Sequence, residues 1–184
     1  LNISGNATLN TDYSVSSTSI IIPAGSTSGT ATATAIADQV DEESETITVD
    51  VSGVSGGNGA SESGNQQVSI TITDDDTAAF TVTQSSGSTS VAESGSSDDF
   101  TVVLGSEPTG NVVFDLSASD STEATLSAST LTFTSSNWNS AQTVTVTGVN
   151  DNVSDDNVTS TITVAINQGS TNDAKYDALS SPVS

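Results

Sequence analysis

Residues 67–76 read Gln-Val-Ser-Ile-Thr-Ile-Thr-Asp-Asp-Asp, and residues 77–82 follow at once as Thr-Ala-Ala-Phe-Thr-Val. Aliphatic and hydroxyl residues alternate before and after the aspartates, which is the pattern of half-buried β-strands. The three adjacent carboxylates repel one another, because two unit charges about 4 Å apart cost roughly 4 kcal/mol at an effective dielectric near 20. The stretch therefore predicts two strands that meet at a domain junction, with a positive charge bound beside the aspartates.

The chain has almost no positive charge of its own to place there. Its 184 residues include 23 acids, no histidine and a single base, Lys175, which gives a formal net charge of −22. A hard cation held by oxygen ligands is the expected counter-charge. A surface of one negative sign repels nucleic acid and anionic membranes. No apolar run reaches the length of a membrane span, so neither nucleic acid nor membrane insertion is expected.

The composition also limits the fold and the chemistry. Hydrophobic residues make up 33% and aromatic residues 4% of the chain, so the core must be built mainly from Val, Ile, Leu and Ala, which favours thin β-layers and an all-β fold. Cysteine is absent, which excludes disulfides, thiolate metal sites and a cysteine nucleophile. We expect no enzyme, because only a paired-carboxylate glycosidase is conceivable and no spacing of the acids supports one.

Alternation and turn residues predict a series of short strands in each half of the chain. In the first half they are expected at residues 20–22, 30–36, 47–51 and 68–73, with an acidic loop at residues 38–43. In the second half they are expected at residues 80–82, 100–104, 112–116, 131–133 and 143–149.

The two halves keep a common spacing. Asp38 and Asp151 are 151 − 38 = 113 residues apart, and Glu42 and Asp155 are 155 − 42 = 113 residues apart. Equal spacing of two acids in one loop indicates a repeat, so we predict one repeat at residues 1–76 and another at residues 77–184. With this period the first repeat lacks its opening strands and the second lacks its closing strand, which suggests a window of a longer tandem array.

The same residues resemble two successive Calx-beta repeats. The resemblance rests on Asp12-Tyr13 ahead of residues 20–25, the acidic loop after Ile36, the alternating strand at residues 47–51 and the strand with its aspartates at residues 68–76. The second repeat contributes Val91-Ala92-Glu93 and the pair Asp151 and Asp155. The resemblance implies two tandem immunoglobulin-like antiparallel β-sandwiches, with calcium at the pole where the acidic loops converge.

Calcium takes six to eight oxygen ligands in flexible geometry, which suits acids at mixed spacing on loops. The candidate ligands of the first repeat are Asp38, Asp41, Glu42, Asp74, Asp75 and Asp76, and those of the second are Glu93, Asp151 and Asp155. The alternative interpretation is a solvated acidic surface that binds no ion.

The predicted function is that of a calcium-binding structural or adhesive extender in a large secreted or cell-surface protein, in which calcium makes the junction between repeats rigid. Its partners would be neighbouring repeats of the same chain or filament. The alternative is a module of an adhesin that binds glycans or another surface. That function needs an exposed aromatic patch, for which the chain offers Trp138 and two tyrosines.

Overall fold

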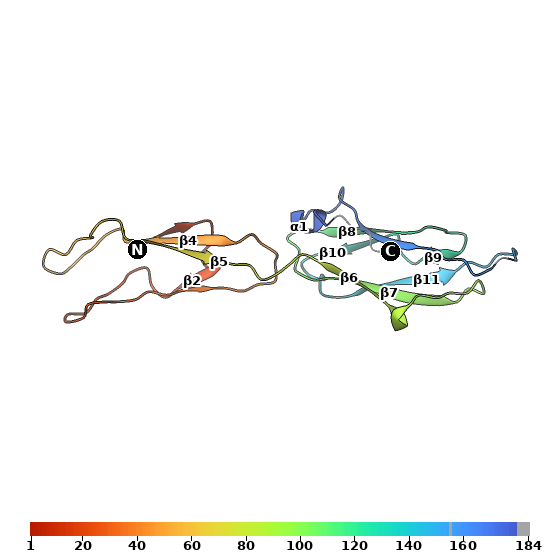
Figure 1. The fold of residues 1–184 in the computed structure, drawn as a ribbon, viewed down its shortest axis with the longest axis horizontal. Helices are drawn as coiled ribbons and strands as arrows, with labels where there is room; N and C mark the ends of the chain where they lie inside the picture. The colour runs from red at the N-terminus through yellow and green to blue at the C-terminus, as the bar shows by residue number, and fades with distance from the viewer. Residues whose placement is uncertain (155, 180–184) are drawn as a thin grey trace. The chain divides into compact units, whose positions relative to one another are not determined.

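The computed structural model describes residues 1–154 and 156–179 (Figure 1). Its strands pair antiparallel throughout, which confirms the predicted all-β sandwich class. The chain divides into two compact units. Unit 1 consists of Leu1–Asp38 and Glu42–Asp75, and unit 2 consists of Gln39–Asp41 and the chain from Asp76 onward.

Unit 1 contains two small sheets. Its strands are β1 (Asn2–Gly5), β2 (Tyr13–Val15), β3 (Ala33–Ala35), β4 (Glu45–Asp50) and β5 (Gln67–Ile72). One sheet has the order β1-β4-β5 and the other pairs β2 with β3. Tyr13 and Ile47 are its buried hydrophobic residues, at 4% and 2% exposure. Few large side chains are therefore buried in this unit, so its stability must depend strongly on other contacts.

The strand predicted at residues 20–22 does not form. Ile20, Ile21 and Ile22 lie outside every strand and are exposed, Ile21 at 79%. Alternation and branching favour a strand only where a neighbouring layer buries the apolar face. In unit 1 the second layer is the two-stranded β2-β3 sheet, which does not bury these isoleucines.

Unit 2 is a larger sandwich. Its strands are β6 (Phe80–Gln84), β7 (Ser97–Leu104), β8 (Val112–Ala118), β9 (Ala124–Leu126), β10 (Thr130–Phe133), β11 (Gln142–Gly148) and β12 (Ile162–Ile166), with a 3₁₀ turn, η1, at Ser85–Gly87. They form sheets of order β6-β7-β11-β9 and β10-β8-β12. Aliphatic residues from both sheets fill the space between them.

Three phenylalanines lie at the centre of this core. Phe114 and Phe133 are fully buried, and the Phe114 ring meets Phe80 and Phe133 edge-to-face with centroids 4.9 and 5.9 Å apart. Edge-to-face contacts of this kind add to the free energy gained by burial alone. Trp138 also packs against the core of unit 2.

A short helix, α1 (Ala174–Asp177), closes one end of unit 2 and was not expected from the sequence. The buried Asp173 caps it by accepting from the backbone N–H groups of Lys175 and Tyr176, and it also accepts from Thr109. Burial alone would raise the pKa of Asp173, but these hydrogen bonds together hold that pKa below its usual value. The buried Tyr176 hydroxyl completes the attachment through Ser106, donating to its backbone oxygen at 2.8 Å and accepting its N–H at 3.0 Å.

The two units share part of their strand plan. In unit 1, β1 pairs with β4 and β2 pairs with β3; in unit 2, β8 pairs with β12 and β9 pairs with β11. In chain order, β1, β2, β3 and β4 of unit 1 correspond to β8, β9, β11 and β12 of unit 2, so in both units an outer pair of strands encloses an inner pair in the sequence. Unit 2 adds β10 beside β8 and the strands β6 and β7 beside β11, whereas unit 1 adds β5 beside β4.

Candidate metal centre

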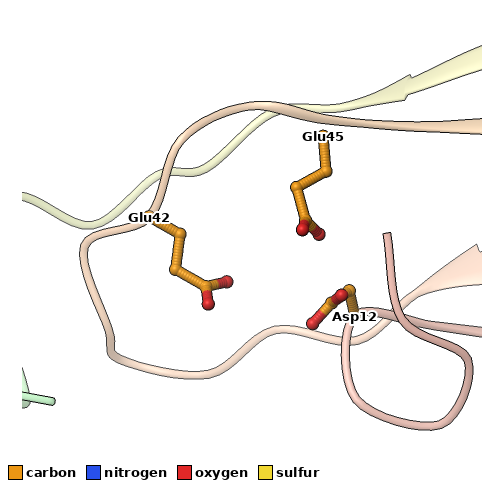
Figure 2. A group of neighbouring side chains, drawn as sticks. All are labelled: Asp12, Glu42 and Glu45. Carbon is orange, nitrogen blue, oxygen red and sulfur yellow. The ribbon is translucent and has the colours of Figure 1, made fainter. Parts of the chain in front are cut away.

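Three acids of unit 1 converge at one place. Asp12, Glu42 and Glu45 can each bring one carboxylate oxygen within 4.8 Å of the oxygens of the other two, and Figure 2 shows the three side chains facing a common space. Unit 1 holds no basic side chain, because the single base, Lys175, belongs to unit 2. The charge of this cluster is therefore not neutralised by a side chain of its own unit.

Asp12 is the buried member of the cluster, at 7% exposure. It ends a tight turn in which its own N–H donates to the Thr8 carbonyl at 2.9 Å and its carboxylate accepts from the Thr8 N–H. Its carbonyl accepts from the N–H of Ile36, just beyond β3, at 2.9 Å. Because Tyr13 beside it is buried in β2, the backbone holds this carboxylate in place.

Glu42 and Glu45 come from the segment that leads into β4. The Glu42 N–H donates to the Asp74 carboxylate at 3.2 Å, which ties this loop to the residues that follow β5. Glu45 is the first residue of β4 and lies opposite Ile72. Glu45 lies two residues before the buried Ile47 in the same strand, so the side chains of both residues project from the buried face of that strand.

The crowding of these carboxylates disfavours their charged forms. Desolvation raises the pKa of Glu42, and the nearby charges of Asp38, Asp12 and Asp74 raise it further. Desolvation also raises the pKa of Glu45, together with a hydrogen bond to Asp12 and the charges of Asp12 and Glu42. Like charges held close together in partial burial have this effect, and a bound cation would reverse it.

These shifts predict a pH dependence for the calcium-free chain. An acid whose pKa is raised by folding costs stability when it is ionised, so unit 1 should become less stable as the pH rises from 4.5, the ordinary value, through the raised pKa values of Glu42 and Glu45. Thermal unfolding in chelator between pH 4.5 and 7 checks this. The double variant E42Q/E45Q should flatten the dependence, while E62Q, a neutralisation outside the cluster, should preserve it.

The structure places the predicted ligands of the first repeat in three groups. Asp38 and Asp74 lie near enough to Glu42 to raise its pKa, so they neighbour the cluster. Asp74, Asp75 and Asp76 form a second group of consecutive residues whose carboxylate oxygens come within 4.8 Å of one another.

Asp41 makes other contacts. Its carboxylate accepts from the Ala78 N–H at 2.7 Å and forms an ion pair with Lys175 at 3.2 Å. Both of these partners belong, with Asp41, to unit 2.

The predicted ligands of the second repeat are not gathered into a comparable cluster among the described residues. Glu93 lines a cleft of unit 2 together with Glu123 and Asp156. Asp151 lies on an exposed loop, where it accepts from the Val153 N–H at 2.8 Å. Asp155 lies outside the described residues.

Sequence reasoning did not place Asp12 and Glu45 among the candidate ligands. The spacing of two residues between Glu45 and Ile47 could have identified Glu45, because it places both side chains on the inward face of the strand. An acid at such a position needs a polar partner or an ion. The signal for Asp12 was its place beside Tyr13, the one large apolar side chain in a polar stretch. Both signals depend on knowing which strands face each other.

All the side-chain ligand atoms of this cluster are carboxylate oxygens, which are hard donors. Three carboxylates can supply up to about six oxygens, which agrees with the preference of Ca²⁺ for flexible oxygen coordination, whereas Mg²⁺ demands a stricter octahedron and keeps most of its water. With neither cysteine nor histidine in the chain, side-chain ligands typical of zinc or copper are not available.

No protein-family model matches the chain, and comparisons with curated proteins and with solved structures found no match either. Within residues 1–154 and 156–179, no helix is long and apolar enough to cross a membrane.

Proposed function

We propose that this chain is a calcium-binding structural or adhesive extender segment of a large secreted or cell-surface repeat protein. The observation that carries the proposal is the convergence of Asp12, Glu42 and Glu45, one of them buried, in a unit without a basic side chain. A divalent ion held by these oxygens would offset the desolvation and the charge repulsion that together raise the pKa values of both glutamates.

An ion at this position would act on both layers of unit 1. Asp12 precedes β2, in one sheet, while Glu42 precedes β4 and Glu45 is the first residue of β4, in the other. Each ligand bond would therefore connect elements that few apolar contacts hold together. Binding energy of this kind contributes to folding whenever the site is absent from the unfolded chain.

The extender role is supported by the repeated strand plan. Repeat proteins use copies of one unit to gain length, and stiffness then depends on how the copies are joined. Asp74, Asp75 and Asp76 are consecutive residues at the end of unit 1 and the start of unit 2, and their carboxylate oxygens lie within 4.8 Å of one another, which supports a role for calcium in restricting the linker. The function as a glycan-binding module receives less support, because Trp138 packs against the core of unit 2.

Terbium luminescence tests the assignment of the cluster. Tb³⁺ replaces Ca²⁺ at oxygen sites and emits when a nearby aromatic ring transfers energy to it, and Tyr13 is the aromatic residue of unit 1 and adjoins Asp12. We expect sensitised emission that calcium quenches by competition and that D12N weakens strongly. The Y13F variant should lose most of the emission and retain calcium binding. Emission that survives both substitutions would place the ion elsewhere.

A further inference from the structure

Unit 2 has an open side between its two sheets. Within the described residues, β12 pairs with β8 alone and β6 pairs with β7 alone, so each is an edge strand of its sheet. A cleft of about 880 Å³ lies here, lined by Val82 of β6, by Ile162 and Val164 of β12, and by the core residues Phe100 and Val146. Edge strands beside a cleft that is partly lined by apolar side chains form a template for pairing with another segment.

The hydrogen bonds of β12 show which of its backbone groups lie on the open side. Ser119 N donates to the Thr161 carbonyl and Asn167 N donates to the Val113 carbonyl, so the odd-numbered residues face β8. In an antiparallel ladder the alternate residues direct their N–H and C=O groups the other way. The N–H groups of Ile162, Val164 and Ile166 therefore point away from β8.

Unit 1 shows what lies at the equivalent edge. There β4 takes the place of β12, and its outer edge is covered by β5, with Val51 N donating to the Gln66 carbonyl. The odd-numbered residues of β4 therefore pair with β5. Adding the repeat period of 113 to 49 and 51 gives 162 and 164, so the groups that bind β5 in unit 1 correspond to the groups of β12 that point away from β8.

We propose that the open edge of β12 and the adjoining cleft bind an added antiparallel strand with the chemistry of β5. The occupant is an uncharged extended segment in which branched aliphatic and hydroxyl residues alternate, as at residues 68–73. Its aliphatic side chains enter the cleft and its backbone extends the β10-β8-β12 sheet. Glu93, Glu123 and Asp156 line the cleft as well, and their negative charge disfavours an acidic occupant.

The test uses the whole chain and a capped synthetic peptide with the sequence of residues 66–73. Hydrogen exchange measured by NMR should show the amides of Ile162, Val164 and Ile166 slowed by about ten-fold or more when peptide is added. A scrambled peptide of identical composition should give no slowing. Slowing in other strands with none in β12, or equal effects of both peptides, would overturn the proposal.

Two further comparisons distinguish the source of the strand and the role of the edge. Without peptide, the exchange of the same amides should not depend on the protein concentration. If it became slower as the protein concentration rose, a second copy of the chain would cover the edge, and the assignment to an added segment would be overturned. I162P removes one free donor without removing a hydrogen bond to β8, and proline is tolerated at the start of an edge strand. It should abolish peptide binding with unit 2 still folded, while I162V should bind normally. None of these measurements depends on calcium.

Discussion

Calcium at about one hundred times its dissociation constant should stabilise unit 1 by about 2.7 kcal/mol. In a unit this small, that free energy raises the melting temperature by on the order of 10 °C or more. The physical reason is that the proposed site requires Asp12, Glu42 and Glu45 together, and folding brings these residues together. Differential scanning calorimetry of the full chain in calcium and in chelator measures the shift.

Controls separate calcium binding from general charge screening. Magnesium at the same ionic strength should give a much smaller shift, because it surrenders its water reluctantly and requires stricter geometry. D12N should remove most of the calcium effect, and E62Q, with the same change in charge outside the cluster, should retain it. Equal shifts with calcium, magnesium and sodium at matched ionic strength would show that the acids form a solvated surface.

The second large effect is expected in the core of unit 2. Replacing Phe114 by alanine should lower the free energy of unfolding of this unit by about 3–5 kcal/mol, since the ring is fully buried and its removal leaves a cavity in the core. The loss includes the edge-to-face contacts with Phe80 and Phe133. Urea unfolding of the full chain, followed by Trp138 fluorescence, reports on unit 2.

A matched substitution tests whether packing is the cause. F114L keeps much of the volume and should cost clearly less than F114A, and neither change should alter the calcium-dependent transition of unit 1. If F114A shifted both transitions equally, the two units would unfold together. That result would contradict the expectation that each unit unfolds independently of the other.

The strands were predictable where alternation coincides with a second layer that covers it. Residues 112–116 were expected as a strand and lie within β8, and the strand expected at residues 143–149 overlaps β11 up to Gly148, because each of these strands lies between neighbours in a sheet that packs against another. Residues 20–22 are three consecutive isoleucines, which favour a strand through their branched side chains, and they form none because in unit 1 they are not buried by a facing layer. Propensity is local, whereas burial depends on the whole sandwich.

The acidic region that holds the candidate site was predictable from the sequence, but the residues that converge there were predictable only in part. The excess of acids over bases indicated an oxygen-bound cation, and the 38–43 loop and the aspartates after β5 indicated one region. Asp12 and Glu45 join that region only because β2 and β4 come together in the folded unit. The contact of Asp41 with Lys175 joins residues far apart in sequence, so no spacing could have predicted it.

The most direct test of the calcium proposal is an isothermal calorimetric titration of the full chain with calcium at neutral pH, beside the same titration of D12N. We expect a saturable site in the wild-type chain, with a dissociation constant in or below the range of roughly 10⁻⁴ to 10⁻³ M typical of extracellular calcium modules, and we expect this site to be lost in D12N. Binding that is unchanged in D12N would contradict the assignment of the site to Asp12, Glu42 and Glu45. The absence of saturable binding in the wild-type chain would contradict the calcium proposal itself.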